Sequence, residues 1–384
     1  MVEMVQQGVA VREVARRCRV APATVHLWVH RSAGSPLDRV EWADRPSAPH
    51  HVHNRTTPEV EQRVLACRRE LAAPDNPLGF IGPQAIFEAL QAQGIGAPHL
   101  RTIARILRRH GILDQVARRR FPPPPPGWYL PDVAQGVADL DAFDIIEGLI
   151  LEGEGEIEVL TGVALWAPEV NAWPAPAVPA PLVVEHLLAR WRRVGLPPYA
   201  QFDNDTRFQG GHNHPDVIGR VARVCLSLGV TPVFTPPREP GFQGPLERFN
   251  GLWQAKVWHR LHHDSFLVLC ARSDRFVGAY TARRATRRDA TAPRRPFPLD
   301  WRLDLQRPPH GRLLYLRRTD DQGVVSLLGR RFPITPLWSH RLVRCVVDLD
   351  HHCIQVFRLR RRDPKDQPLL TTLEYRLPHR RFRE

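Results

Sequence analysis

Residues 199–208 read YAQFDNDTRF, and residues 230–250 read VTPVFTPPREPGFQGPLERFN. Each stretch opens with a short apolar run of the kind that forms a buried strand. The first run ends at Asp203, and the second passes through a proline- and glycine-rich loop into a helix whose first turn carries Glu247. Mg²⁺ and Mn²⁺ prefer oxygen ligands in proteins. Carboxylates at a strand end and at a helix start therefore predict a shared site for a divalent metal.

The composition favours a polyanion as the partner. The chain has 384 residues, enough for two or three domains. It carries 54 Lys and Arg against 40 Asp and Glu, a formal net charge of +14. Such an excess points to nucleic acid first and to an acidic membrane surface second. The six cysteines contain no C-x-x-C pair, which argues against a zinc ribbon or a disulfide framework and fits a reducing cytoplasm.

The sequence predicts no membrane segment. No apolar run reaches the roughly 18 residues that a membrane helix needs. The first residues also lack a basic stretch followed by an apolar one, the pattern of a secretory signal. We therefore expect a cytoplasmic protein that makes no contact with a membrane.

The N-terminal region, residues 1–35, predicts a helix-turn-helix unit. Helical patterns at residues 11–17 and 24–31 are separated by a short turn. The region resembles the small helix-turn-helix of many bacterial transposases and repressors, which implies that Thr24 and His26 contact the major groove of DNA. A plain two-helix packing unit is the alternative. Residues 36–56 are rich in proline and histidine and predict a linker.

Residues 57–120 predict a second helical unit that binds DNA. Its last expected helix, residues 98–110, is apolar on one side and basic on the other. The basic side chains are Arg101, Arg105, Arg108 and Arg109. Arginines on such a helix contact phosphates more often than bases. The following residues, 121–130, include five consecutive prolines and predict a stiff spacer.

Residues 131–290 predict an α/β core. Strand-like runs occur at residues 136–144, 157–166, 170–173, 199–202 and 230–234. Helical patterns follow the third, fourth and fifth of these runs. The expected order is thus three strands, a helix, a strand, a helix, a strand and a final helix.

This core resembles that of the DDE superfamily, which includes retroviral integrases and insertion-sequence transposases. The family's second acidic residue lies in a motif like (S/T)-D-N-G-x-E-F, where residues 202–208 of this chain read FDNDTRF. Its glutamate lies in a motif like P-x-x-x-G-x-x-E-R-F-N, where residues 240–250 read PGFQGPLERFN. Two departures are Asp205 in place of the usual glycine and Arg207 in place of the usual acidic residue. The resemblance implies a ribonuclease-H-like mixed sheet of five strands with helices.

The resemblance also implies a site. Its catalytic and metal-binding residues would be Asp139, Asp203 and Glu247, with Asp141 as the alternative to Asp139. They would hold two Mg²⁺ or Mn²⁺ ions, and no small-molecule cofactor is expected. Further contacts to DNA are expected from the helix of the glutamate and its continuation, at Asn250, Gln254 and Lys256.

The C-terminal region predicts a separate small β domain. Residues 291–311 are a basic connector. Residues 312–384 contain five short strand-like runs followed by a basic tail. This part resembles the SH3-like barrel that is appended to many transposase cores.

The resulting expectation is a transposase that binds the ends of a mobile element and then cuts and joins DNA strands. The resemblance implies a homo-oligomer on DNA, with element ends and target DNA as partners, associated with the nucleoid of a bacterium. The alternative is a DNA-binding regulator that keeps the fold without catalysis. A ribonuclease-H-like nuclease acting on RNA hybrids ranks third, because it would not need the helix-turn-helix units.

Overall fold

The computed structural model describes residues 1–44, 56–113, 125–211, 215–239, 241–287 and 292–383. The chain divides into two units, Met1–Thr57 and Pro58–Glu384. Much of the expected linker and the start of the expected spacer lie outside the described residues. None of the described helices is both long and apolar enough to cross a membrane.

The first unit is a small helical bundle. Its helices are α1 (Val2–Gln6), α2 (Val11–Cys18) and α3 (Pro22–Ser32), followed by a short 3₁₀ turn at Leu37–Arg39. Val14, Ala15 and Val25 form its buried centre. The turn between α2 and α3 is tight because Arg19 takes a left-handed conformation. Pro22 begins α3, at a position where the backbone N–H of a helix has no partner within the helix, so the missing N–H of proline costs nothing. Both expected helices are present, each slightly longer than its sequence pattern.

The second unit begins with three helices around an apolar core of their own. They are α4 (Pro58–Ala72), α5 (Pro83–Ala92) and α6 (Leu100–Arg109). Ile86, Leu90, Ile103 and Leu107 are almost completely buried between them. The apolar stripe of α6 faces this core, which leaves its arginines on the outside.

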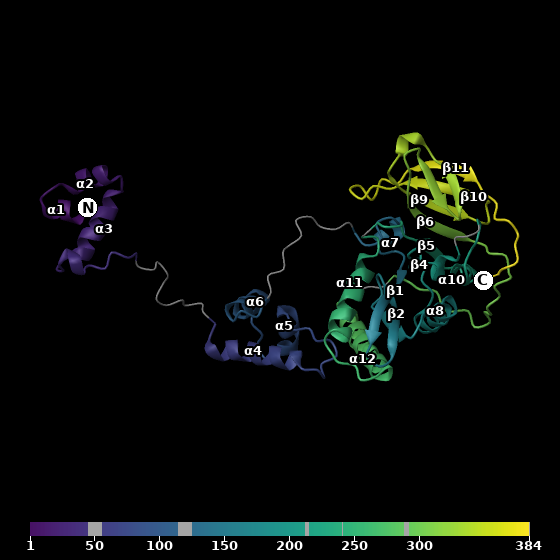
Figure 1. Ribbon diagram of the computed structural model, residues 1–384, viewed down its shortest axis with the longest axis horizontal. Coiled ribbons are helices and arrows are strands. Elements are labelled where there is room, and N and C mark those ends of the chain that lie inside the picture. Colours follow the sequence, from purple (N-terminus) through teal and green to yellow (C-terminus); the bar gives the residue numbers. More distant parts are fainter. Residues whose placement is uncertain (45–55, 114–124, 212–214, 240, 288–291, 384) are drawn as a thin grey trace. The chain divides into compact units, whose positions relative to one another are not determined.

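The remainder of the second unit is a mixed α/β structure (Figure 1). Its elements up to residue 285 run, in order, α7 (Pro131–Ala134), β1 (Leu140–Leu151), β2 (Gly155–Ala164), β3 (Val170–Ala175), α8 (Ala180–Val194), β4 (Tyr199–Phe202), α9 (Thr206–Gln209), α10 (Arg220–Ser227), β5 (Thr231–Phe234), α11 (Gly244–Trp253), a π-helical turn (Gln254–Trp258) and α12 (Phe266–Ala285). Strands β1, β2 and β3 are antiparallel, whereas β4 and β5 run parallel to β1. The sequence of strands and larger helices is as expected.

Helices cover both faces of this sheet. On one face α8 and α10 pack through Val183, Trp191 and Val224. On the other face α11 and α12 pack through Phe249 and Phe276 (Figure 1). Successive residues of β1 therefore point alternately toward the α8 side and toward the α11 side.

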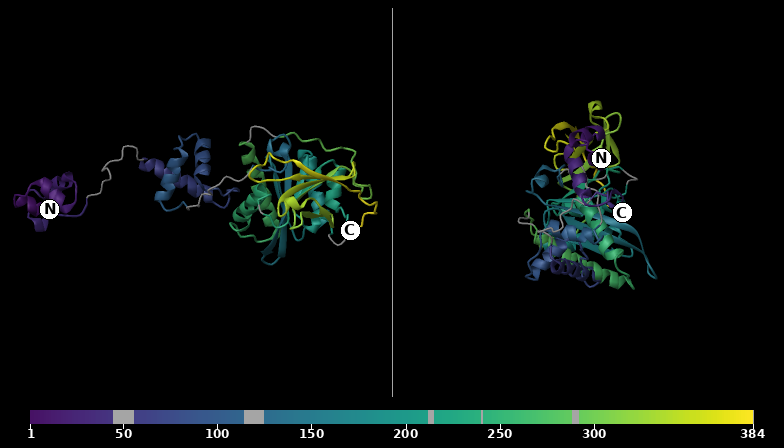
Figure 2. Two further views of the ribbon diagram at one scale, coloured as in Figure 1. Left: turned by 90° about the horizontal axis from the view of Figure 1, so that it is seen from above. Right: turned by 90° about the vertical axis from the view of Figure 1, so that its left-hand side faces the viewer.

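The C-terminal strands continue this sheet. They are β6 (Arg312–Arg318), β7 (Val324–Leu327), β8 (Arg330–Pro333), β9 (Leu342–Asp348), β10 (Cys353–Arg358) and β11 (Leu369–Glu374), with a 3₁₀ turn at Pro336–Trp338. Strand β6 pairs in parallel with β5, through Val233 with Leu314 and Phe234 with Tyr315. Among the described residues nine strands thus form one sheet in the order β11-β10-β9-β6-β5-β4-β1-β2-β3, and β7 with β8 forms a separate hairpin (Figure 2).

The expected separate barrel is therefore wrong, and so is the limit of five strands for the sheet. The edge of β5 would otherwise expose unpaired backbone N–H and C=O groups, and β6 satisfies them. Every residue of β9 is buried, as in a strand covered on both faces. Short strands separated by turns have the same sequence pattern in either arrangement. A further correction concerns the spacer, since residues 128–130 are buried in the core.

A buried ion network fastens the expected basic connector to the core. Arg190 of α8 donates to both carboxylate oxygens of Asp141, at 3.0 and 2.8 Å. Arg294 of the connector donates to Asp139 at 2.8 Å and to Asp141 at 2.6 Å. The side chains of Arg190 and Asp141 are fully buried. Burial alone would raise the pKa of Asp141, but the two guanidinium groups hold it well below its usual range.

Loss of one cation from this network should destabilise the fold. Arg190→Met would leave Asp141 with one cation, Arg294, and the indole N–H of Trp191, and would also remove the cation that contacts Asn171. Unpairing a buried charge costs about 3 to 5 kcal/mol, so we expect the free energy of unfolding, measured with urea, to fall by about 3 kcal/mol. The matched control is Arg193→Met, three residues along the same helix and exposed. Equal effects of the two substitutions would contradict a structural role for the network.

Candidate functional site

Asp203 lies directly after β4, in the middle of the sheet. Its carboxylate accepts the backbone N–H of Asp205 at 3.0 Å and is only partly buried. Asn204 joins this strand end to the end of β5 by donating to the carbonyl of Thr235 at 2.7 Å. Arg317 of β6 donates to the side-chain oxygen of Asn204 at 2.9 Å. Burial and the negative charges of neighbouring carboxylates raise the pKa of Asp203.

Asp144 of β1 belongs to the same site. Strands β1 and β4 pair in parallel through Ala142 and Gln201, and the same register places residue 144 beside residue 203. The amide of Asn250 donates to Asp144 Oδ2 at 2.8 Å. Burial, together with the negative charges of Asp203 and Glu247, raises the pKa of Asp144 to about 6. Its carboxylate is thus held close to two others without a compensating cation.

Glu247 approaches from the first turn of α11. Its side chain is exposed, and Oε1 accepts the backbone N–H of Gly241 at 3.4 Å. Asn250 lies one helical turn further on and points toward β1, as its bond to Asp144 shows. The helix therefore brings a carboxylate and an amide to the side of the sheet that Asp144 faces.

The structure does not bring Asp139 to this group. The carboxylate of Asp139 accepts the backbone N–H of Trp166 at 2.8 Å and pairs with Arg294. Its alternative, Asp141, lies in the same buried network. The expected strand began too early, because β1 starts only at Leu140 and runs on to Leu151. Asp141 points to the α8 side of β1, whereas Asp144 points to the α11 side. Because side chains alternate along a strand, Asp144 must lie on the face opposite to Asp139 and Asp141. This alternation was the signal in the sequence that could have identified Asp144.

The three carboxylates are unpaired with cations. Among the described residues, none of Asp144, Asp203 and Glu247 forms an ion pair with an arginine or lysine. The nearby Arg207 pairs with other acids, namely Glu147, Glu158 and Asp205. Within the described parts of the chain, no three His, Cys, Asp or Glu side chains lie close enough together to hold a metal ion as they stand. Among the described residues these three acids therefore form no ion pair, although the positive charge of Arg207 acts on Asp203 from nearby.

A groove opens beside Asp203. Its volume is about 530 Å³, and it is lined by Asp203, Asn204, Thr235, Pro236, Pro237, Arg238 and Glu239. Glu239 pairs with Arg318 of β6 and with Arg361, which lies beyond β10. The groove wall is thereby tied to the C-terminal strands.

The other residues expected to bind DNA are dispersed. Gln254 and Lys256 lie in the π-helical turn after α11, and Lys256 Nζ lies 6.0 Å from the ring centre of Phe80. His26 is exposed on α3, whereas Thr24 is half-buried. On α6 the side chains of Arg101, Arg105, Arg108 and Arg109 are exposed, and Arg109 pairs with Glu61. Asn250 alone among the expected DNA contacts touches the carboxylate group, through Asp144.

Comparison with known proteins adds two structural likenesses, and no family model matches the chain. The catalytic core domain of BIV integrase is 22% identical over 36% of this chain and 81% of its own length, with a TM-score of 0.28. A simian T-cell lymphotropic virus intasome in complex with PP2A regulatory subunit B56 gamma is 12% identical over 77% of this chain and 95% of that chain, with a TM-score of 0.33. Scores this low carry no argument, so function must be inferred from the site itself.

The raised pKa of Asp144 predicts how stability depends on pH. The native carboxyl titrates near pH 6, above its usual value of 3.8, so the native state holds this proton more tightly than the unfolded chain. Its contribution to stability is present below about pH 4 and is lost as the pH rises through 6. Asp144→Asn should therefore raise the free energy of unfolding at pH 7.5 by the order of 1 to 3 kcal/mol.

Urea unfolding of both proteins at pH 4 and pH 7.5 checks this expectation. The difference between them should be small at pH 4 and appear at pH 7.5. Glu374→Gln, on an exposed position of β11, is the control and should show no such dependence. A gain for Asp144→Asn of the same size at both pH values would show that charge repulsion is not its cause.

Proposed function

We propose that this chain is an integrase-type DNA transposase that binds the ends of a mobile element and cuts and joins DNA strands. The observation that carries the proposal is electrostatic: the charges of Asp203, after β4, and Glu247, at the start of α11, act on Asp144 of β1, and none of the three forms an ion pair with Arg or Lys among the described residues. Asp203 and Glu247 lie in the two stretches that resemble the DDE motifs. Asp144 takes the place that the sequence had suggested for Asp139.

The residues present fit a hard divalent metal. All the side-chain atoms available are oxygens, from Asp144, Asp203 and Glu247, with the amide oxygen of Asn250 nearby. That oxygen is buried and has no hydrogen-bond partner in the described structure. Mg²⁺ and Mn²⁺ favour such donors. We propose that Asp144, Asp203 and Glu247 would together hold two such ions, since the charges of Asp203 and Glu247 already act on Asp144.

When bound, such ions activate the attacking oxygen and stabilise the leaving oxygen of a phosphodiester. The side chains of the protein position the carboxylates and supply the electrostatic field around them. Asn250 orients Asp144, and Asn204 with Arg317 fixes the end of β4 from which Asp203 projects. The groove beside Asp203 holds the scissile phosphate against these groups. Positioning and electrostatic stabilisation of this kind are the main sources of catalysis in phosphoryl transfer.

A cationic pocket on the C-terminal strands extends the DNA path. It has a volume of about 210 Å³ and is lined by Arg318, Trp338, His340, Arg341, Leu342, Leu359 and Arg360. The guanidinium groups of Arg341 and Arg360 lie 4.6 and 5.3 Å from the ring centre of Trp338. Neither forms an ion pair with an acid among the described residues. Two adjacent guanidinium groups that lack a counter-charge suit a backbone phosphate.

The helical units supply the expected contacts to element ends. Helix α3 exposes His26, and α6 exposes Arg101, Arg105 and Arg108. Two ends must be handled together for transposition, so we propose that the active form is a homo-oligomer on DNA. A regulator without catalysis is the second candidate. The observation that favours it is Arg207, which stands where the related motif has an acid and is held by three carboxylates.

Catalysis should depend on the metal and on all three carboxylates. We expect the full chain, incubated with DNA from either side of its own coding sequence and Mg²⁺ or Mn²⁺, to cut and join strands. Asp144→Asn, Asp203→Asn and Glu247→Gln should each lower the yield of product by about 100-fold or more, because each removes a charge that acts on the reacting phosphate. EDTA should abolish the reaction.

Glu374→Gln is the matched control, since it removes an exposed carboxylate at the far edge of the sheet. DNA binding by each variant is measured in parallel by gel retardation. Binding without product in the wild type would favour the regulator. Unchanged product from Glu247→Gln would refute the proposed site.

The cationic pocket should contribute to DNA affinity in a salt-dependent way. Replacing Arg341 and Arg360 together by alanine should weaken binding and reduce the slope of log affinity against log salt by about 2, one for each lost phosphate contact. Fluorescence anisotropy with a labelled duplex at several salt concentrations measures this slope. The control pair is Arg192 and Arg193, two exposed arginines of α8, of which Arg192 also stacks on an aromatic ring. If the control pair lost as much DNA affinity and salt slope, the pocket would have no specific role and only the overall positive charge would matter.

A further inference from the structure

The loop that leads to Glu247 is anchored by one aromatic side chain. Phe242 lies five residues before Glu247, and its side chain is almost completely buried. Its ring centre lies 5.7 Å from that of Trp128 and 5.3 Å from that of Tyr129. The guanidinium of Arg361 lies 4.9 Å from its ring centre. A buried aromatic ring thus anchors a loop in which Gly241 and, further on, Glu247 are exposed.

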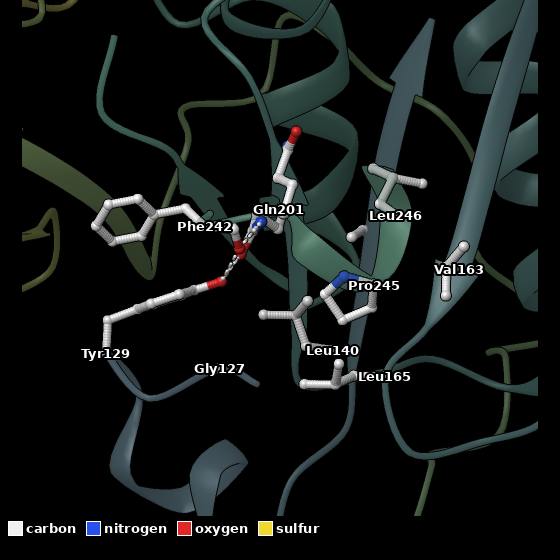
Figure 3. Close-up of a pocket in the computed structure, with 11 residues that line it drawn as sticks. Gly127, Tyr129, Leu140, Val163, Leu165, Gln201, Phe242, Pro245 and Leu246 are labelled. Atoms are coloured by element: carbon white, nitrogen blue, oxygen red, sulfur yellow. Dashed lines mark hydrogen bonds between the residues drawn. The ribbon is translucent and has the colours of Figure 1, made fainter. Parts of the chain in front are cut away.

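The backbone of Phe242 is held as well as its ring. The hydroxyl of Tyr129 donates to the carbonyl oxygen of Phe242 at 3.1 Å, and the amide of Gln201 donates to the same oxygen at 3.2 Å (Figure 3). Gln201 Oε1 is a second acceptor within reach of the Tyr129 hydroxyl, whose single hydrogen is shared between the two oxygens. These three groups form a closed, buried set of hydrogen bonds, which we name the 129–201–242 latch.

The latch connects the segments that carry two of the carboxylates. Gln201 belongs to β4, two residues before Asp203, and Phe242 belongs to the loop before α11. The surrounding cavity measures only about 10 Å³, so there is room for no more than one water molecule. The loop therefore cannot shift at Phe242 without breaking hydrogen bonds or opening the core.

The backbone around Tyr129 is itself held by side chains from the C-terminal region. Arg344 of β9 donates to the carbonyl oxygen of Tyr129 at 2.7 Å. Gln367 donates to the carbonyl oxygen of Trp128 at 3.0 Å. The segment that precedes the core is consequently a rigid support for the loop, with contacts to both parts of the sheet.

We propose that Tyr129 is a positioning residue that, through Gln201 and Phe242, holds the Glu247 loop against the end of β4. In doing so it sets the affinity of the three carboxylates for a divalent ion. The effect on metal affinity rests on the proposed function, whereas the anchoring of the loop does not. Tyr129 itself does not lie among the carboxylates, so its effect is on their arrangement.

Tyr129→Phe tests the proposal because it removes one buried hydroxyl and keeps the ring. Amide hydrogen exchange, followed by mass spectrometry on peptides that cover residues 236–249, should become about five-fold faster or more. That factor corresponds to loss of a hydrogen bond that contributes about 1 kcal/mol. The matched control is Tyr375→Phe, which removes the buried hydroxyl that binds Asp216. The control should leave exchange in residues 236–249 unchanged.

Binding of Mn²⁺ alone, measured by calorimetry on the full chain, gives the second readout. Tyr129→Phe should weaken it about five-fold, whereas strand cutting at saturating Mn²⁺ should remain close to that of the wild type. Gln201→Met should resemble Tyr129→Phe, and the double variant should lose less than the sum of the two single losses, because both side chains hold one carbonyl.

The two proposals fail separately. Unchanged exchange in residues 236–249 would overturn the latch, and so would an equal change in Tyr375→Phe. Accelerated exchange with Mn²⁺ affinity retained would support the loop anchor and overturn its role in setting metal affinity. Absence of Mn²⁺ binding by the wild type would overturn the proposed function, whereas the exchange result would still decide whether Tyr129 anchors the loop.

Discussion

The two-residue period of β1 separates two kinds of carboxylate. Asp141 projects toward α8, where Arg190 and Arg294 neutralise it inside the protein. Asp144 projects toward α11, where Asp203 and Glu247 add negative charge and, among the described residues, no cation forms an ion pair with it. The first acid therefore stabilises the fold, whereas the second has a raised pKa. A single strand thus carries an acid that is neutralised inside the protein and, three residues further on, the acid that we propose as a metal ligand.

The C-terminal strands β6, β9, β10 and β11 belong to the same sheet as β1 and β4 and support the candidate site. Because β6 pairs with β5, Arg317 can reach the end of β4 and bind Asn204 and the carbonyl of Thr235. From β9, Arg344 holds the backbone of Tyr129. Strands that resembled an appended domain in the sequence therefore brace the segments around Asp203 and Glu247. Most of the connector is exposed, but Arg294 turns inward and pairs with Asp139 and Asp141, so its guanidinium is not available to DNA.

Asp203 and Glu247 of the candidate site could be proposed from the sequence because each lies within a short, distinctive motif. Asp203 and Glu247 are each fixed by local context, a strand end and a helix start. Asp144 has no such context, and only its register along β1 distinguishes it from Asp139 and Asp141. The continuation of the sheet from β5 to β6 was not predictable for a similar reason. Pairing between strands depends on contacts distant in sequence, whereas the pattern within a strand is local.

The charge around the site gives a physical reason for a cation in the proposed reaction. Six carboxylates surround it, those of Asp144, Asp203 and Glu247 and those that bind Arg207, at Glu147, Glu158 and Asp205. Among these six acids and Arg207, full ionisation leaves 6 − 1 = 5 negative charges, in a chain whose formal net charge is +14. A DNA phosphate would be repelled from such a place, although the surrounding surface attracts it. Divalent ions would reverse that repulsion at the reacting phosphate, and the exposed arginines would hold the flanking backbone.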